Sequence, residues 1–233
     1  PSGFIALDRI TNGWEKGSIT ILGGRPAMGK TSFLLETARR AAVEFDMPVA
    51  YFSLELSVTQ VSQRMISSLS GIETRLLQTG KVTSQQWDKL HDSMDALSQS
   101  HLFIDDTPNL SLFEFREKCR ALKANADIDL VLVDHIQLMR HSDRRMQNRD
   151  RELSEICKGL KSIARELDIA IVASSQLSRA VESRGGDKRP MLSDLRESGA
   201  LEQDADLVLF LYRPEYYGIT EDWYGKATDG IAE

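Results

Sequence analysis

The sequence predicts an α/β fold in which a largely parallel, twisted sheet carries helices on both faces. Short apolar runs typical of buried strands alternate with longer segments of helical periodicity, the order expected when helices connect parallel strands. The run at residues 130–134 is apolar up to its last residue, as expected where both faces of a sheet are covered. The length of 233 residues fits a single α/β domain, residues 1–233.

Each element follows from a local pattern. We expect strands at residues 18–23, 49–53, 102–105, 130–134, 170–174 and 207–211. We expect helices at residues 31–44, 57–70, 84–99, 111–125 and 150–167. The helix at 150–167 has apolar residues at helical spacing, and Ser111 with Glu114 forms a capping-box pattern. The longest polar connections, residues 140–149 and 180–190, are the best candidates for functional loops.

Composition narrows the function classes. The net charge is −6 and the pI is near 5.4, whereas a protein that coats nucleic acid is normally basic. Any nucleic-acid contact must therefore come from local basic segments such as 140–151 and 179–189, although charge alone favours their interpretation as solvated surface loops. No apolar run is long enough to span a membrane. The cysteines Cys119 and Cys157 suggest simple packing in a reducing compartment, and the histidines show no metal-ligand spacing.

The run Gly24–Thr31 matches the phosphate-binding pattern G-x-x-x-x-G-K-[ST] and lies between a predicted strand and a predicted helix. This context lets main-chain N–H groups and the helix dipole converge on an anion. Lys30 is expected to reach the β- and γ-phosphates, and the Thr31 hydroxyl to bind Mg²⁺. The expected nucleotide-binding residues here are Gly24, Arg25, Pro26, Ala27, Met28, Gly29, Lys30, Thr31 and Ser32.

Three polar residues follow predicted strands, where the ligand crevice of an open parallel sheet lies. Asp134 stands where a carboxylate would hold Mg²⁺ beside the phosphate loop; the alternative is a turn residue. Glu55 could polarise an attacking water, or could simply favour the start of a helix. Gln176 could hydrogen-bond a γ-phosphate, or be an ordinary polar residue at a strand end. The spacing alone leaves these alternatives open.

Further runs occur in a fixed order along the chain. They are Ser53-Leu54-Glu55-Leu56, Val133-Asp134-His135-Ile136-Gln137-Leu138, Ser175-Gln176-Leu177-Ser178-Arg179, Ser193-Asp194-Leu195-Arg196-Glu197-Ser198-Gly199, Leu201-Glu202-Gln203-Asp204-Ala205-Asp206 and Tyr212-Arg213. Together with the phosphate loop, they resemble the C-terminal motor domain of bacterial replicative DNA helicases of the DnaB type. The resemblance covers nearly the whole chain.

The resemblance implies a RecA-like P-loop NTPase fold and a role for each matching residue. Lys30 and Thr31 would hold phosphates and Mg²⁺, with Asp134 as the second magnesium residue. Glu55 would be the catalytic base and Gln176 the γ-phosphate sensor. The remaining implied residues are Arg64, which would contact the nucleotide, and Arg196, Glu197 and Gly199, which would form a loop gripping the DNA backbone. A glycine allows close approach to a phosphate, and main-chain N–H groups can donate to it.

The resemblance also implies an activity and partners. The family forms hexameric rings that hydrolyse ATP to move 5′ to 3′ on single-stranded DNA and unwind duplex DNA at the replication fork. Primase and a helicase loader would be partners, the location would be cytoplasmic, and no membrane would be involved. Two alternatives are a recombinase or clock-type RecA-like ATPase, and a docking module for loader or primase.

Two substitutions and the chain ends depart from the family pattern. Ala27 replaces a common glycine at a variable loop position, so we expect little effect, and His135 replaces a common tyrosine. The chain begins at Pro1 without methionine and ends at Glu233, so we expect a part of a longer protein. The N-terminal collar domain and the C-terminal segment with the arginine finger would lie outside it. Since a finger contributes about 10³–10⁵ in rate, we expect ATP binding with weak hydrolysis.

Overall fold

The computed structural model describes residues 1–141, 149–198, 201 and 204–220, with only the backbone described for 196–198. It contains one six-stranded sheet in the order β3-β2-β4-β5-β1-β6, and every neighbouring pair is parallel. The strands are β1 (Ile19–Gly24), β2 (Val49–Ser53), β3 (Leu102–Asp105), β4 (Leu130–Asp134), β5 (Ala170–Gln176) and β6 (Leu207–Phe210). The predicted parallel sheet is therefore confirmed.

The strand order places the first strand between the last two. β1 pairs with β5 from Ile19↔Ile171 and with β6 from Thr20↔Leu207. β5 separates β1 from β4, so the phosphate loop after β1 and the aspartate that ends β4 flank the end of β5. Gly23 on β1 lies against Phe210 on β6, where a Cβ atom would stand 2.9 Å from the ring.

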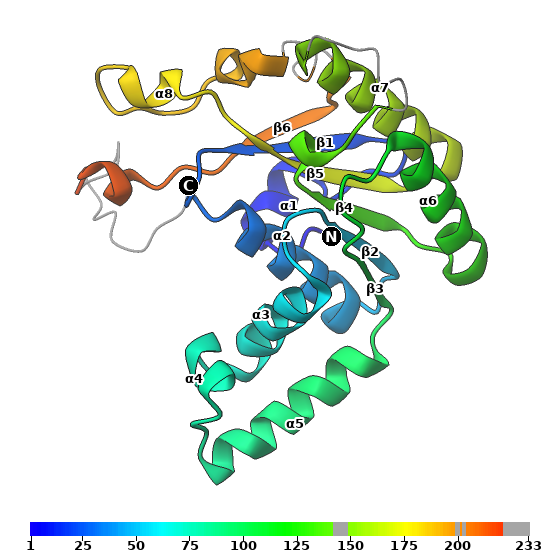
Figure 1. Cartoon of the computed structure of the whole chain (residues 1–233), viewed down its shortest axis with the longest axis vertical. Coiled ribbons are helices and arrows are strands. Elements are labelled where there is room, and N and C mark those ends of the chain that lie inside the picture. The colour runs from blue at the N-terminus through cyan, green and yellow to red at the C-terminus, as the bar shows by residue number, and fades with distance from the viewer. Residues whose placement is uncertain (142–148, 199–200, 202–203, 221–233) are drawn as a thin grey trace.

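Helices cover both faces of the sheet (Figure 1). The α-helices are α1 (Ile5–Thr11), α2 (Lys30–Arg39), α3 (Val58–Ser70), α4 (Thr74–Thr79), α5 (Ser84–Gln99), α6 (Leu112–Ala126), α7 (Arg149–Leu167) and α8 (Ala180–Ser183). One core packs α6 and α7 on the sheet and the other packs α2 and α3 on its opposite face. Alternate residues of β2 enter the two cores, Phe52 on one side and Tyr51 on the other, as the strand period of two requires.

The five predicted helices are present and differ from the prediction mainly at their ends, whereas α1, α4 and α8 were not predicted. The predicted helix at 31–44 is α2 followed by a π-helical turn, Arg40–Glu44. The predicted capping box is present, since the Ser111 hydroxyl accepts from the Glu114 N–H and the Glu114 carboxylate accepts from the Ser111 N–H. The polar connection at 180–190 contains α8, whereas residues 142–148 of the other connection lie outside the described part.

Both cysteines are buried, in agreement with simple packing. Cys119 lies on α6 and Cys157 on α7, and neither forms a disulfide. Burial raises the pKa of the Cys119 thiol and raises that of Cys157 to about 12, so both remain thiols at neutral pH. Within the described ranges, no helix is both long and apolar enough to span a bilayer.

Glu36 on α2 is the centre of a polar cluster that joins α2 to α3. Its carboxylate accepts hydrogen bonds from Arg39, Arg40 and Ser68, with donor–acceptor distances of 2.6 to 2.9 Å. The hydrogen bond from Arg39, followed by those from Arg40 and Ser68, lowers the pKa of Glu36 from about 4.5 to about 2. Arg40 also donates to the Gly3 carbonyl and stacks over Phe4, so the cluster secures the N-terminal segment.

Because the folded-state pKa of Glu36 is depressed, its contribution to stability exists above pH 4.5 and disappears as the pH falls towards 2. We expect Glu36→Gln to reduce the free energy of unfolding by about 1–3 kcal/mol at pH 7, after allowance for solvent screening. The difference between wild type and variant should shrink at pH 3. Urea unfolding at both pH values measures it, with the exposed Glu15→Gln as control; an unchanged difference at pH 3 would contradict the assignment.

Candidate nucleotide-binding site

A cavity of about 470 Å³ lies at the carboxyl ends of the central strands. It is lined by Pro26, Ala27, Gly29, Lys30, Thr31, Ser32, Glu55, Arg64, Asp134, His135, Gln176 and Arg213. These residues come from the loop after β1 and the start of α2, from the ends of β4 and β5, and from the segments that follow β2 and β6. The structure therefore collects most of the predicted nucleotide-site residues around one space, where an open α/β sheet binds its ligands.

The phosphate loop runs from the end of β1 into α2. Gly29 has φ of +98° and caps α2, a conformation that glycine adopts without steric cost. The Lys30 ammonium folds back over the loop and donates to the Gly24 and Arg25 carbonyls at 2.8 and 3.1 Å. Burial lowers the pKa of Lys30, while the nearby Asp134 opposes this shift. A partly buried ammonium bonded to neutral carbonyls is well suited to bind an anionic phosphate.

Ala27 occupies the left-handed region, with φ of +64°, so the backbone here favours glycine. An L-residue costs about 1–2 kcal/mol in this conformation, and part of the gain from glycine is lost to unfolded-chain entropy. We expect Ala27→Gly to raise the free energy of unfolding by about 0.5–1 kcal/mol. The exposed α6 variant Ala121→Gly should instead lower it by about 1 kcal/mol. Denaturant midpoints compare the two, and a destabilised Ala27→Gly would show that the loop is not strained.

Two predicted loop residues direct their side chains away from the cavity. Arg25 is only 5% exposed; its guanidinium donates to the Glu182 carboxylate on α8 at 2.8 and 3.0 Å and to the Leu177 carbonyl at 2.7 Å. Met28 is buried in the α2 core. Gly24 is the last residue of β1, and its carbonyl accepts from Lys30. In this structure Arg25 and Met28 therefore shape and anchor the loop rather than line the cavity.

Asp134 is buried at the end of β4, with its carboxylate held by two hydroxyl groups. Ser174 on β5 donates to one oxygen at 2.6 Å, and Tyr51 on β2 donates to the other at 3.3 Å. Burial, strengthened by Asp134, raises the pKa of Tyr51 well above its usual value, so Tyr51 stays a donor. Within the described ranges Asp134 forms no ion pair, and its hydroxyl partners are neutral. An oriented carboxylate without a cationic partner, lining the same cavity as the Thr31 hydroxyl, fits Mg²⁺.

Glu55 follows β2 and presents a carboxylate that is 60% exposed at the cavity wall. Its carboxylate oxygen lies 3.7 Å from Nε2 of His135, the residue after Asp134. Burial lowers the pKa of His135, so the imidazole is neutral at pH 7. Glu55 can therefore contact a water molecule in the cavity without being bound in a strong ion pair.

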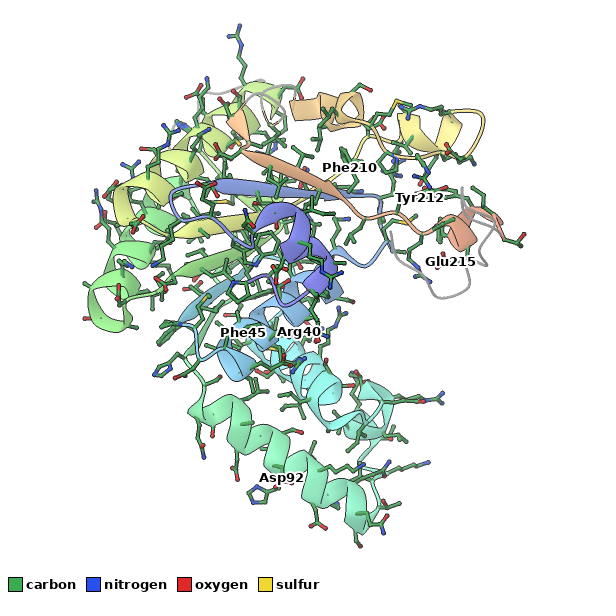
Figure 2. All side chains as sticks on the ribbon, turned by 180° about the vertical axis from the view of Figure 1, so that it is seen from behind. Arg40, Phe45, Asp92, Phe210, Tyr212 and Glu215 are labelled. Atoms are coloured by element: carbon green, nitrogen blue, oxygen red, sulfur yellow. The ribbon has the colours of Figure 1, made fainter. Side chains whose placement is uncertain are left out.

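Sequence reasoning assigned no role to two lining residues, His135 and Arg213. Arg213 follows β6, and its guanidinium donates to the Glu215 carboxylate at 2.6 Å; Glu215 and Tyr212 mark this segment in Figure 2. Their position in the sequence could have identified both residues, because each comes shortly after a strand whose carboxyl end faces the cavity.

The structure describes only part of the segment that was predicted to grip DNA. The expected loop at 193–199 is largely a 3₁₀-helix, Leu192–Ser198, whose start is held by an ion pair between Arg184 and Asp194. The side chains of Arg196 and Glu197, and the whole of Gly199, are outside the described part. Their proposed role therefore rests on the sequence pattern.

One family model and several curated proteins match this chain over most of its length. The family described as "DnaB-like helicase C terminal domain" matches residues 1–232. The replicative DNA helicase DnaC of Bacillus subtilis (strain 168) is 48% identical over 217 residues, covering 93% of this chain and 48% of that protein. The replicative DNA helicase DnaB of Geobacillus stearothermophilus is 46% identical over 217 residues, with the same coverage of 93% and 48%. The chain thus spans about half the length of the curated relatives it matches.

Solved structures agree with this assignment. A structure described as an ATPase domain superposes with a TM-score of 0.90 at 37% identity, covering 100% of this chain and 85% of that chain. "The Structure Of A DnaB-Like Replicative Helicase And Its Interactions With Primase" gives a TM-score of 0.89 at 37% identity, covering 100% of this chain and 57% of that chain. The predicted RecA-like fold is confirmed. With its phosphate loop, its parallel sheet and a family match over residues 1–232, the chain belongs to the DnaB-like helicase C-terminal domain family.

Proposed function

We propose that this chain is the ATP-hydrolysing motor domain of a replicative DNA helicase. The observation that carries the proposal is the cavity that brings together Lys30, Thr31, Glu55, Asp134 and Gln176 from separate strand ends. In the complete protein, ATP hydrolysis with Mg²⁺ would drive 5′ to 3′ movement on single-stranded DNA and unwinding of duplex DNA. Family membership supports this activity over a recombinase or clock-type ATPase.

Each residue has a chemical task in the proposed reaction. Main-chain N–H groups of the phosphate loop and the Lys30 ammonium bind the β- and γ-phosphates. Thr31 and Asp134 would hold Mg²⁺, which neutralises charge on the phosphate oxygens when bound. Glu55 accepts a proton from the water that attacks the γ-phosphorus, as the bond to the ADP oxygen breaks. From the cavity wall, Gln176 would hydrogen-bond the γ-phosphate and Arg64 would contact the nucleotide.

The proposal also includes a DNA-binding loop and protein partners. Arg196, Glu197 and Gly199 would grip the DNA backbone, one small loop from each subunit of a hexameric ring. This arrangement suits a chain whose net charge is −6, because sequence-independent grip then needs only a few local phosphate contacts. A similar structure is described with its interactions with primase, which supports primase as a partner; a helicase loader would be another. Such a motor would act in the cytoplasm, at the replication fork.

Steady-state ATP hydrolysis and ATP binding, measured with Mg²⁺ across protein concentrations and with and without single-stranded DNA, test the proposal. We expect Lys30→Ala to lower turnover by about 10²–10³-fold, the range for removing a group that stabilises developing charge. The exposed Lys81→Ala serves as a matched control and should leave turnover unchanged. ATP binding and turnover that are both indifferent to Lys30 would overturn the proposal.

The alternatives are separated by a second assay on the complete protein. Unwinding of a forked duplex with a 5′ single-stranded tail is expected for a helicase. Strand exchange without unwinding would instead identify a recombinase, and a partner complex that forms equally well without nucleotide, combined with absent turnover, would identify a docking module.

A further inference from the structure

The end of β5 extends beyond its partner strand. The pairing of β4 with β5 runs from Leu130↔Ala170 to Val133↔Ala173, while β5 continues along β1 as far as Gln176. Adjacent residues of a strand direct their main-chain groups to opposite neighbours. Since the Leu177 N–H donates to Gly24 on the β1 side, the main-chain groups of Gln176 face the β4 side, where β4 has already ended.

The side chain of Gln137 supplies the missing partner. Its Oε1 accepts from the Gln176 N–H at 3.2 Å, and its Nε2 donates to the Gln176 carbonyl at 3.2 Å. Nε2 also donates to the Ser175 hydroxyl at 2.8 Å. A carboxamide offers the same donor and acceptor as a peptide group, so Gln137 binds the main chain of Gln176 as a neighbouring strand would. We call these contacts the Gln137 clamp.

Gln137 is itself firmly held. It lies in the 3₁₀-helix Ile136–Leu138, which follows Asp134 after one residue and is anchored by the fully buried Ile136. Arg149, the first residue of α7, donates to the Gln137 carbonyl at 2.6 Å and to the Met139 carbonyl at 3.2 Å. The Gln137 clamp therefore joins the backbone of Gln176 to the strand end that carries Asp134.

We propose that Gln137 is a positioning residue that acts through Gln176. Gln137 is not among the residues that line the cavity, whereas the exposed side chain of Gln176 is. By holding the Gln176 backbone at two points, the clamp fixes the position from which the Gln176 carboxamide reaches a terminal phosphate. The inference rests on the proposed ATP hydrolysis. If it holds, substitution of Gln137 lowers turnover only when Gln176 is present.

A double-mutant cycle tests this dependence. Gln137→Met keeps the length of the side chain and removes the clamp. We expect it to lower kcat about 10-fold, while KM for ATP changes less than about twofold, because the contact is made to the terminal phosphate alone. In a Gln176→Ala background the same substitution should lower kcat by less than about twofold further. Gln85→Met, exposed on the distant helix α5 (Figure 1), is the matched control.

A readout that does not need hydrolysis accompanies the cycle. Hydrogen exchange of the Gln176 amide should be faster in Gln137→Met than in wild type or Gln85→Met, while the amides of β2 stay protected. Equal kcat losses in both backgrounds, or an unchanged exchange rate of the Gln176 amide, would overturn the inference. If turnover proves independent of Lys30, the proposed function fails, and the exchange rate still decides whether the clamp holds Gln176.

Discussion

Asp134→Asn is expected to lower ATP hydrolysis by about 10²–10³-fold, the loss that corresponds to several kcal/mol of transition-state stabilisation by a bound metal. The substitution keeps the shape of the side chain but removes the charge, and it places an NH₂ group beside a hydroxyl donor. Ser174 and Tyr51 are hydroxyl groups that can rotate to accept instead of donate, so the fold should survive. Turnover measured over a range of Mg²⁺ concentrations checks the result.

The matched control is Asp92→Asn, which changes an exposed aspartate on α5, remote from the sheet (Figure 2). It should hydrolyse ATP as the wild type does. ATP binding without Mg²⁺ should be similar in all three proteins, because Lys30 and the phosphate loop remain. Wild-type turnover in Asp134→Asn would remove Asp134 from the magnesium site, and a large loss of stability would show that its role is structural.

Phe115→Ala is expected to lower the free energy of unfolding by about 3–5 kcal/mol, the usual range for removing a buried aromatic ring. Phe115 on α6 is fully buried and packs against Phe52 on β2, with ring centroids 4.7 Å apart and planes tilted by 57°. The ring is a main contact of α6 with the sheet, and alanine would leave a cavity in this core. Denaturant unfolding with circular dichroism measures the change.

Phe113→Ala is a close control, because Phe113 lies on the same helix but is 65% exposed. It should change stability by less than about 1 kcal/mol. Similar losses for the two variants would show that α6 docks on the sheet differently. Neither residue lines the nucleotide cavity, so the ATP affinity of the folded Phe115→Ala protein should match that of wild type.

The sheet was predictable because buried parallel strands appear as short apolar runs. The predicted strands at 49–53, 102–105 and 130–134 coincide with β2, β3 and β4. β5 was predicted to end at residue 174, yet it extends to Gln176. The prediction stopped early because the last residues of β5 are polar, although their backbone is extended and pairs with β1 and with Gln137. The helices α1 and α4 were missed since seven and six residues are too few to show helical periodicity.

The site was only partly predictable, because a pattern identifies residues but not where their side chains point. The phosphate-loop motif placed Arg25 among the nucleotide-binding residues, but it gave no sign that the Arg25 guanidinium binds Glu182, which lies 157 residues later. The strand order could not be predicted for a similar reason, because no local sequence pattern indicates that β5 lies between β1 and β4. The role of Glu55 came from the family resemblance, since spacing alone left two interpretations open.

The strand order also determines when the chain can fold. Ile19 on β1 pairs with Ile171 on β5, and Thr20 pairs with Leu207 on β6. During synthesis, β1 therefore leaves the ribosome long before either of the strands with which it pairs. Pairing between such distant segments is slow, and unpaired apolar strands are prone to aggregation. A nascent chain would thus carry the phosphate-loop sequence early but could not grip a nucleotide until β5 had been made. ATP capture by this domain would then report that synthesis has passed β5, and chaperones that shield apolar strands would be most needed before that point.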